Sequence, residues 1–235
     1  MDQLPYSFVD DIAAHLPKRD LEAVRNRIDS SLWAEVAKSH ISNRKTYLFS
    51  LYCEGDALRY YLSTDTEHLL KLEDLKKLNR KFVRFERFCA EEFEDDDPDD
   101  DRLLKFKDCP EITNDEVLSV IDLIAVCSDG FLQNITFMLP SEHDILQDTI
   151  MKKILETNTS ARKIFILSYS TNSEDFLRKI IVKGGQQSII LRGQWPGTIK
   201  ESLERFVCTS DFVYLETNSL TPFGSDLFKR IIDFW

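Results

Sequence analysis

The chain has 235 residues, of which 43% are hydrophobic and 30% charged, a balance typical of folded globular proteins. Its formal net charge is −11, but nine acidic residues lie between residues 91 and 101, so the remainder is nearly neutral. A nearly neutral surface argues against broad binding to nucleic acid or to anionic membranes, because both need a basic face.

The cysteines, the histidines and the lengths of the apolar runs indicate the kind of compartment and chemistry to expect. No run approaches the roughly 20 apolar residues of a membrane span, and the N-terminus does not resemble a signal peptide. The five cysteines are widely spaced and form no C-x-x-C pair, which predicts reduced thiols inside the cell. The four histidines do not fall at metal-ligand spacing, so we expect no metal and no cofactor.

The first forty residues predict a row of short helices. Apolar residues recur every three or four positions, as one buried helix face requires. A first helix is expected over residues 4–17, with Pro5 in its first turn and Pro17 as its stop. A second helix is expected to begin near Lys18, and a third near Ser30 or Ser31, whose hydroxyls could cap it.

Residues 46–80 are predicted to form a helical linker. Tyr47–Tyr52 and Ala57–Leu62 continue the helical pattern, and Thr64 with Glu67 predicts a capping box before a leucine-rich helix.

From Lys81 onward the sequence predicts alternating strands and helices. The aromatic segment 82–88 is expected to be a strand, and the acidic run 91–101 is expected to be a disordered loop. Capping boxes are predicted at Thr113, Ser141, Thr171 and Thr198. Helices are predicted at 113–128, 141–156, 171–182, 198–207 and 225–235, and strands at 134–139, 163–168, 188–192 and 212–216.

The later strands are apolar on both faces, which is typical of parallel strands covered by helices. The fold class is therefore α/β with a parallel sheet. Strand centres recur every 23 to 31 residues, which favours a leucine-rich-repeat-like α/β solenoid over a compact doubly wound sheet. The repeat consensus is followed best at Val213-x-Leu215-x-x-Asn218-x-Leu220.

The helical segment at the N-terminus also carries a specific pattern. It reads Leu4-Pro5-x-x-Phe8-x-x-x-Ile12-x-x-x-Leu16-x-x-x-Asp20-Leu21-x-x-Val24, followed by Trp33-x-x-Val36. This pattern resembles an F-box, the helical motif that docks substrate receptors onto the Skp1-type adaptor of cullin-RING ubiquitin ligases. With the α/β repeats behind it, the chain is similar to members of the expanded nematode F-box family.

The resemblance implies a division of the chain into an F-box-like domain (1–45), the helical linker (46–80) and a repeat domain (81–235) that binds a client protein. It implies no catalytic residues, a cullin reached through the adaptor, and a cytoplasmic or nuclear location. The residues expected to bind the adaptor are Leu4, Pro5, Phe8, Ile12, Leu16, Leu21, Val24 and Trp33.

Other interpretations stay open at this point. Ser7 stands where the family usually has an acid, and Ser31-Leu32 replaces a Cys-Lys/Arg pair, so a binding or inhibitory module without ligase docking is the alternative. A small α/β enzyme is disfavoured because the sequence has no phosphate-binding or nucleophile motif. The basic, aromatic stretch 71–87 could indicate nucleic-acid contact. Acidic residues dilute its positive charge, however, and its leucines indicate an ordinary amphipathic helix. Trp195 is expected either to anchor a client or to pack.

Overall fold

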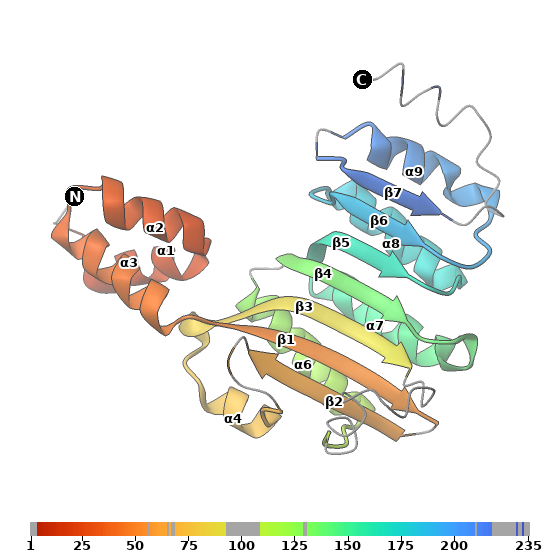
Figure 1. The fold of residues 1–235 in the computed structure, drawn as a ribbon, viewed down its shortest axis with the longest axis horizontal. Coiled ribbons are helices and arrows are strands. Elements are labelled where there is room, and N and C mark those ends of the chain that lie inside the picture. The colour runs from red at the N-terminus through yellow and green to blue at the C-terminus, as the bar shows by residue number, and fades with distance from the viewer. Residues whose placement is uncertain are drawn as a thin grey trace.

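The computed structural model describes residues 4–55, 57–64, 66, 69–92, 109–128, 131–209, 211–217, 229 and 232. These residues form a three-helix unit followed by an α/β unit built on one sheet (Figure 1). The helices are α1 (Tyr6–His15), α2 (Lys18–Arg27), α3 (Ser31–Asn43), α4 (Leu72–Lys77), α6 (Asn114–Cys127), α7 (Asp144–Glu156), α8 (Thr171–Lys183) and α9 (Lys200–Val207). The strands are β1 (Lys45–Glu54), β2 (Ala57–Thr64), β3 (Val83–Glu92), β4 (Phe131–Met138), β5 (Ser160–Ile166), β6 (Ser188–Leu191) and β7 (Tyr214–Thr217). Short 3-10 turns are η1 (Arg80–Phe82), η2 (Ser141–His143) and η3 (Gly197–Ile199).

The three predicted N-terminal helices are present, and they form a unit with its own core. Pro5 and Pro17 immediately precede α1 and α2, where a missing backbone N–H costs nothing. The helices bury a small apolar cluster that is separate from the core of the sheet. Its fully packed members are Val9, Ala13, Leu21, Val36 and Ala37.

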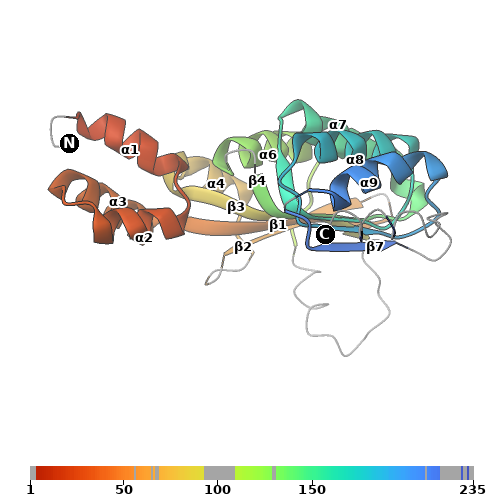
Figure 2. The ribbon, with the colours of Figure 1, turned by 90° about the horizontal axis from the view of Figure 1, so that it is seen from above.

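The strands form one seven-stranded sheet in the order β2-β1-β3-β4-β5-β6-β7 within the described residues. Only β2 runs antiparallel to its neighbour, and β3 to β7 are parallel and follow the order of the chain. Figure 2 shows α6, α7, α8 and α9 together on one face of this sheet. The predicted α/β class with a mostly parallel sheet is therefore confirmed.

The predicted helical linker (46–80) is wrong in its first part, where β1 (Lys45–Glu54) and β2 (Ala57–Thr64) pair as a hairpin, whereas α4 (Leu72–Lys77) lies within the predicted leucine-rich helix. Tyr47, Phe49 and Leu51 are buried on alternate positions, the period of a strand rather than a helix. Glu54 pairs with Ala57 across Gly55, whose φ of 56° suits a tight hairpin turn. Apolar residues between the buried ones hide the alternation in the sequence.

The predicted capping boxes have different outcomes. The box at Thr113 and Glu116 is formed, with Glu116 N–H donating to Thr113 Oγ1 over 3.3 Å. The box at the start of α8 uses Ser170 and Ser173 instead of Thr171 and Glu174.

Three other predicted helix starts are displaced. Ser141 and Thr198 lie inside η2 and η3, so neither caps the α-helix that follows. Each of these turns follows a proline, Pro140 or Pro196, and the α-helix begins only after the turn, at Asp144 or Lys200. Thr64 lies in β2, and α4 begins only at Leu72.

Two predictions fall mainly outside the described residues. Glu91 and Glu92 end β3, but the rest of the acidic run is not described, and the predicted helix 225–235 is described only at two positions. Glu67, the second half of the predicted box at Thr64, also lies outside. Among the described helices, none has the length and hydrophobicity needed to cross a membrane.

The formed and unformed boxes give a matched pair for testing the fold. Thr113→Ala should lower the free energy of unfolding by about 1 kcal/mol, because it leaves an N-terminal N–H of α6 without its acceptor. Ser141→Ala should change it by less than about 0.5 kcal/mol, because the Ser141 hydroxyl caps no helix. Urea unfolding of both variants checks this, and equal losses would contradict the assignment.

Candidate partner-docking surface

The start of α1 exposes large apolar side chains. Leu4, Tyr6 and Phe8 are 38%, 48% and 49% exposed, and Pro5 between them is exposed as well. We call these four residues the α1 tip. The helix is fixed here because Val9 N–H donates to the Pro5 carbonyl over 3.2 Å, which turns Val9 inward and Phe8 outward. The tip lies at the end of the three-helix unit remote from the sheet (Figure 1).

The eight residues predicted to bind an adaptor therefore separate into two groups. Leu4, Pro5 and Phe8 are exposed, and Ile12 is half-buried one turn after Phe8. The other residues are structural: Leu21 is fully buried, and Leu16, Val24 and Trp33 pack against the core of the helical unit. A partner can reach the first group directly, whereas the second group gives the unit its shape.

A partly buried polar cluster joins this helical unit to the sheet. Asp10 on α1 accepts hydrogen bonds from His40 Nε2 (2.8 Å) and from Lys81 Nζ (2.6 Å). Lys81 lies in η1, the turn that precedes β3. His40 is fully buried, and its ring lies 5.1 Å from the ring of Phe82. We call Asp10, His40 and Lys81 the latch, because it connects α1, α3 and η1.

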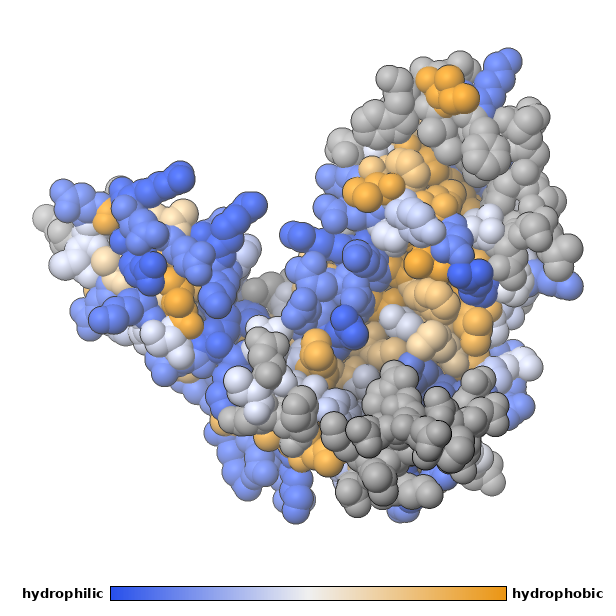
Figure 3. Space-filling model, in the orientation of Figure 1, coloured by the Kyte–Doolittle hydropathy of each residue, from blue (hydrophilic) through white to orange (hydrophobic). Residues whose placement is uncertain are grey.

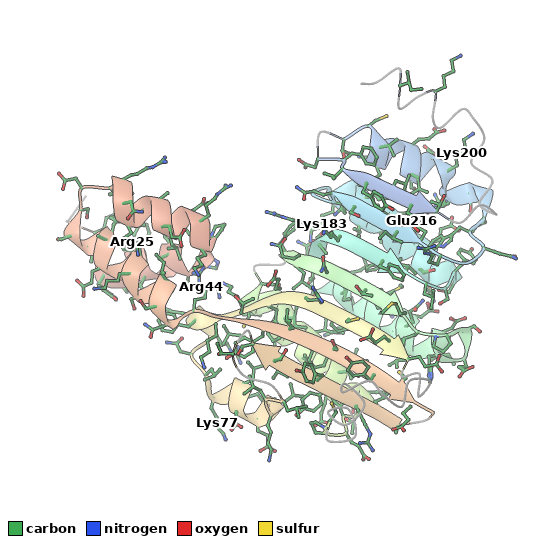
Figure 4. All side chains as sticks on the ribbon, in the orientation of Figure 1. Arg25, Arg44, Lys77, Lys183, Lys200 and Glu216 are labelled. Atoms are coloured by element: carbon green, nitrogen blue, oxygen red, sulfur yellow. The ribbon has the colours of Figure 1, made fainter. Side chains whose placement is uncertain are left out.

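Arg44, the residue between α3 and β1, reinforces the latch. Its guanidinium donates to the carbonyls of Leu16 (2.6 Å) and Ala13 (3.0 Å), which are at the C-terminal end of α1. A cation is favourable there because the helix dipole places partial negative charge at the C-terminal end of α1, where the Ala13 carbonyl also accepts from the backbone N–H of Leu16. Figure 4 shows Arg44 at the junction between the helical unit and the sheet.

The contacts of His40 indicate a neutral imidazole. Burial lowers its pKa, the hydrogen bond to Asp10 opposes this, and the charge of Arg44 lowers it further. Arg44 donates toward His40 Nδ1 over 3.4 Å, so Nδ1 is the acceptor and Nε2 carries the proton given to Asp10. Burial alone would raise the pKa of Asp10, but the hydrogen bonds from Lys81 and His40 leave it below its usual value.

A second surface with apolar residues is the sheet face that α6 to α9 leave uncovered. Phe165 and Ile190 are neighbours in register on β5 and β6 and are only partly buried, and Leu167 and Tyr214 beside them are exposed. We call these four residues the sheet-face patch. Figure 3 shows hydrophobic residues gathered over this face, with hydrophilic ones among them. The Arg192–Glu216 ion pair is one of these charged contacts.

The structure also places two nucleophilic side chains, Ser168 and Cys127, and the predicted client anchor Trp195. The Ser168 hydroxyl donates to the Leu139 carbonyl over 3.2 Å, and Cys127 is buried. Trp195 packs rather than anchors a client: it is buried, donates to the Arg192 carbonyl and meets Tyr169 edge to face at 5.3 Å. Each of these three side chains therefore has a structural role, either in a hydrogen bond to the backbone or in packing.

One group of described residues could hold a metal ion. Glu92, Glu142 and His143 place one ligand atom each within 4.8 Å of one another at the carboxyl end of β3 and after β4. The sequence separates Glu92 from the other two by fifty residues, so no ligand spacing could reveal the group. Exposed acidic groups often meet in this way without an ion, so the geometry alone assigns no metal.

Comparison with known proteins found no match to a protein-family model, to a curated protein or to a solved structure. The features that bear on function are therefore the two surfaces and the latch that fixes the helical unit beside the sheet.

The latch predicts how stability depends on pH. His40 has a lowered pKa in the folded protein, so the unfolded chain binds more protons as the pH falls below the usual value of 6.5. The free energy of unfolding should therefore fall from about pH 7 to about pH 5.5, and His40→Gln should reduce this loss. His15→Gln on the exposed side of α1 is the control and should keep the full loss; denaturant unfolding at each pH measures it. Equal pH dependence in both variants would contradict the neutral His40.

Substitution of the two neighbouring acids of α1, Asp10 and Asp11, distinguishes the latch from an ordinary surface ion pair. Asp10→Asn should lower the free energy of unfolding by about 1–3 kcal/mol, because it weakens hydrogen bonds to two partly or fully buried groups. Asp11 also pairs with Lys81, at 2.8 Å, but its side chain is 66% exposed, so Asp11→Asn should cost less than about 1 kcal/mol. Denaturant unfolding measures both, and a larger loss for Asp11→Asn would contradict the assignment.

Proposed function

We propose that the chain is a substrate receptor of a Skp1–cullin-type ubiquitin ligase. The three-helix unit docks a Skp1-type adaptor through the α1 tip, and the α/β unit binds a client protein. The chain performs no chemistry itself: it holds the client close to the ubiquitin-carrying enzyme, and proximity supplies the rate gain. Such a receptor would work in the cytoplasm or the nucleus.

The observation that carries the proposal is the exposure of the F-box-like residues at the α1 tip. Leu4, Pro5 and Phe8 stand at the spacing of the motif, and the same residues are left in solvent while Leu21 fills the core. Burying the still exposed half of each large side chain would contribute on the order of 1 kcal/mol. A small apolar cluster with a polar rim is the usual composition of a docking surface.

The arrangement of the α/β unit supports the repeat interpretation. Consecutive parallel strands from β3 to β7 are neighbours, and their helices lie on one face (Figure 2). A solenoid stacks its units in this sequential way, whereas a doubly wound fold places helices on both faces. The face opposite α6 to α9, including the sheet-face patch, would then bind the client.

The alternative function is a binding or inhibitory module that no longer docks a ligase. The observation in its favour is Ser7, which lies exposed between Tyr6 and Phe8 of the α1 tip and stands where the family usually has an acid. The two functions differ in one respect: only the receptor binds the adaptor.

Adaptor binding by purified chain tests the proposal. The intact protein should co-purify with a Skp1-type adaptor, and Leu4→Ala with Phe8→Ala should weaken the complex by about tenfold or more, because hot-spot side chains are lost. Both residues are exposed, so the folded state should be retained.

The matched control removes exposed apolar residues elsewhere. Val213→Ala with Tyr214→Ala, at 70% and 46% exposure beside and within β7, should leave adaptor affinity within about twofold. If the intact protein does not bind the adaptor, the receptor function is excluded and the binding-module alternative is favoured.

A further inference from the structure

A basic cleft separates the corner between α1 and α2 from the amino-terminal edge of the parallel strands. We propose that this cleft binds an anionic segment of another protein, either acidic or phosphorylated. It has a volume of about 550 Å³, and the V-shaped gap between the helical unit and the sheet is visible in Figure 3. Its cationic lining residues are Lys18, Arg44, Lys45, Arg84 and Arg162.

The charge of the cleft is opposite to that of the chain. Five lysine and arginine side chains line it, and Glu86 is the one carboxylate among its lining residues, in a protein with a formal charge of −11. Lys18 and Arg162 are exposed, and neither forms an ion pair in the part of the chain that the structure describes. Like charges gathered in a concave site raise the local concentration of oppositely charged ligands.

Two of the arginines are held in place by the fold. The Arg162 guanidinium lies 6.0 Å from the centre of the Phe131 ring. Phe131 in turn packs on Gly185, where a Cβ atom would lie 3.1 Å from the ring, and Gly185 has a φ of 86°. Arg44 is held by the carbonyls at the end of α1. Arginines fixed in this way lose less conformational freedom when they meet a carboxylate or a phosphate.

A simpler explanation would be that these cations only satisfy carbonyls at helix ends. It accounts for Arg44, whose hydrogen bonds go to α1. It does not account for Arg162, which lies at the start of a strand over an aromatic ring, or for Lys18, whose ammonium has no hydrogen-bond partner within the described residues. The cleft therefore carries positive charge beyond what the fold uses.

The dimensions and surroundings favour a protein segment over nucleic acid. Nucleic acid is bound along an extended basic track, and affinity grows with the number of phosphates contacted. Here the basic lining is confined to one cleft, and Asp10 and Asp11 lie on the adjacent face of α1, paired with Lys81. A short anionic peptide matches a site of this size.

The cleft is separate from the proposed adaptor surface. His15 and Leu16 at the far end of α1 line the cleft, whereas Leu4 and Phe8 form the tip at the other end. The proposal therefore does not depend on ligase docking, and loss of the tip should leave it unchanged.

Fluorescence anisotropy with three labelled peptides tests the proposal: one rich in aspartate, one with phosphoserines at the same positions, and one with unmodified serines. At least one anionic peptide should bind at least about tenfold more tightly than the serine peptide, with affinity falling as salt rises. The anionic peptide that binds better identifies carboxylate or phosphate as the recognised group.

Two pairs of substitutions make the test specific. Lys18→Gln with Arg162→Gln should weaken anionic-peptide binding by about tenfold or more, since two charge-assisted contacts are lost. Lys152→Gln with Arg205→Gln removes two exposed cations on α7 and α9 and should change it by less than about twofold. Circular dichroism verifies that both variants are folded.

Three outcomes would overturn the proposal. The first is that the serine peptide binds as tightly as both anionic peptides. The second is that the cleft and control variants lose the same affinity. The third is that a labelled single-stranded oligonucleotide of equal charge binds more tightly than either anionic peptide, which would assign the cleft to nucleic acid. Leu4→Ala with Phe8→Ala should leave peptide binding unchanged, so failure of adaptor docking and failure of the cleft are distinguishable.

Discussion

The hydrogen bonds of Asp10 to His40 and Lys81 are the interaction on which the arrangement of the molecule depends. The helical unit and the sheet have separate cores, so apolar packing alone does not fix one against the other. A single carboxylate receives donors from α3 and from the segment before β3 and connects the two units. Because burial lowers the pKa of His40, the folded state that holds this connection is more stable at neutral than at acidic pH.

With the latch in place, the two ends of α1 present different chemistry. The first turn is apolar and points away from the sheet, whereas the last turn borders the basic cleft. A short helix thus separates the exposed apolar α1 tip from the basic cleft, and the sheet-face patch adds a third surface on the α/β unit. Proximity between partners requires such a fixed geometry, since a loosely tethered unit would lower their effective concentration.

The periodicity of apolar residues was enough to predict α1 to α3, α6 to α9 and the strands β3 to β7. Each of these helices buries one face, and each of these strands contains a run of apolar residues. It failed at the β1–β2 hairpin, where apolar residues such as Leu48 and Tyr52 fill the positions between the buried ones. Contacts over long sequence separations could not be predicted. Asp10 and Lys81 are 71 residues apart, and Lys18 and Arg162 line the same cleft although they are distant in the sequence. The sequence pattern included both Phe8 and Leu21. Only the structure shows that Phe8 is exposed at the α1 tip and that Leu21 is buried in the core.

Hydrogen–deuterium exchange of the full chain, with and without a purified Skp1-type adaptor, shows directly whether the α1 tip binds the adaptor. We expect the adaptor to slow exchange in the first turns of α1 (Tyr6–His15) and to leave exchange in β4 to β7 unchanged, because the adaptor would cover only the α1 tip. Unchanged exchange in α1 at saturating adaptor, or protection confined to the sheet, would contradict the assignment of the helical unit as the docking surface.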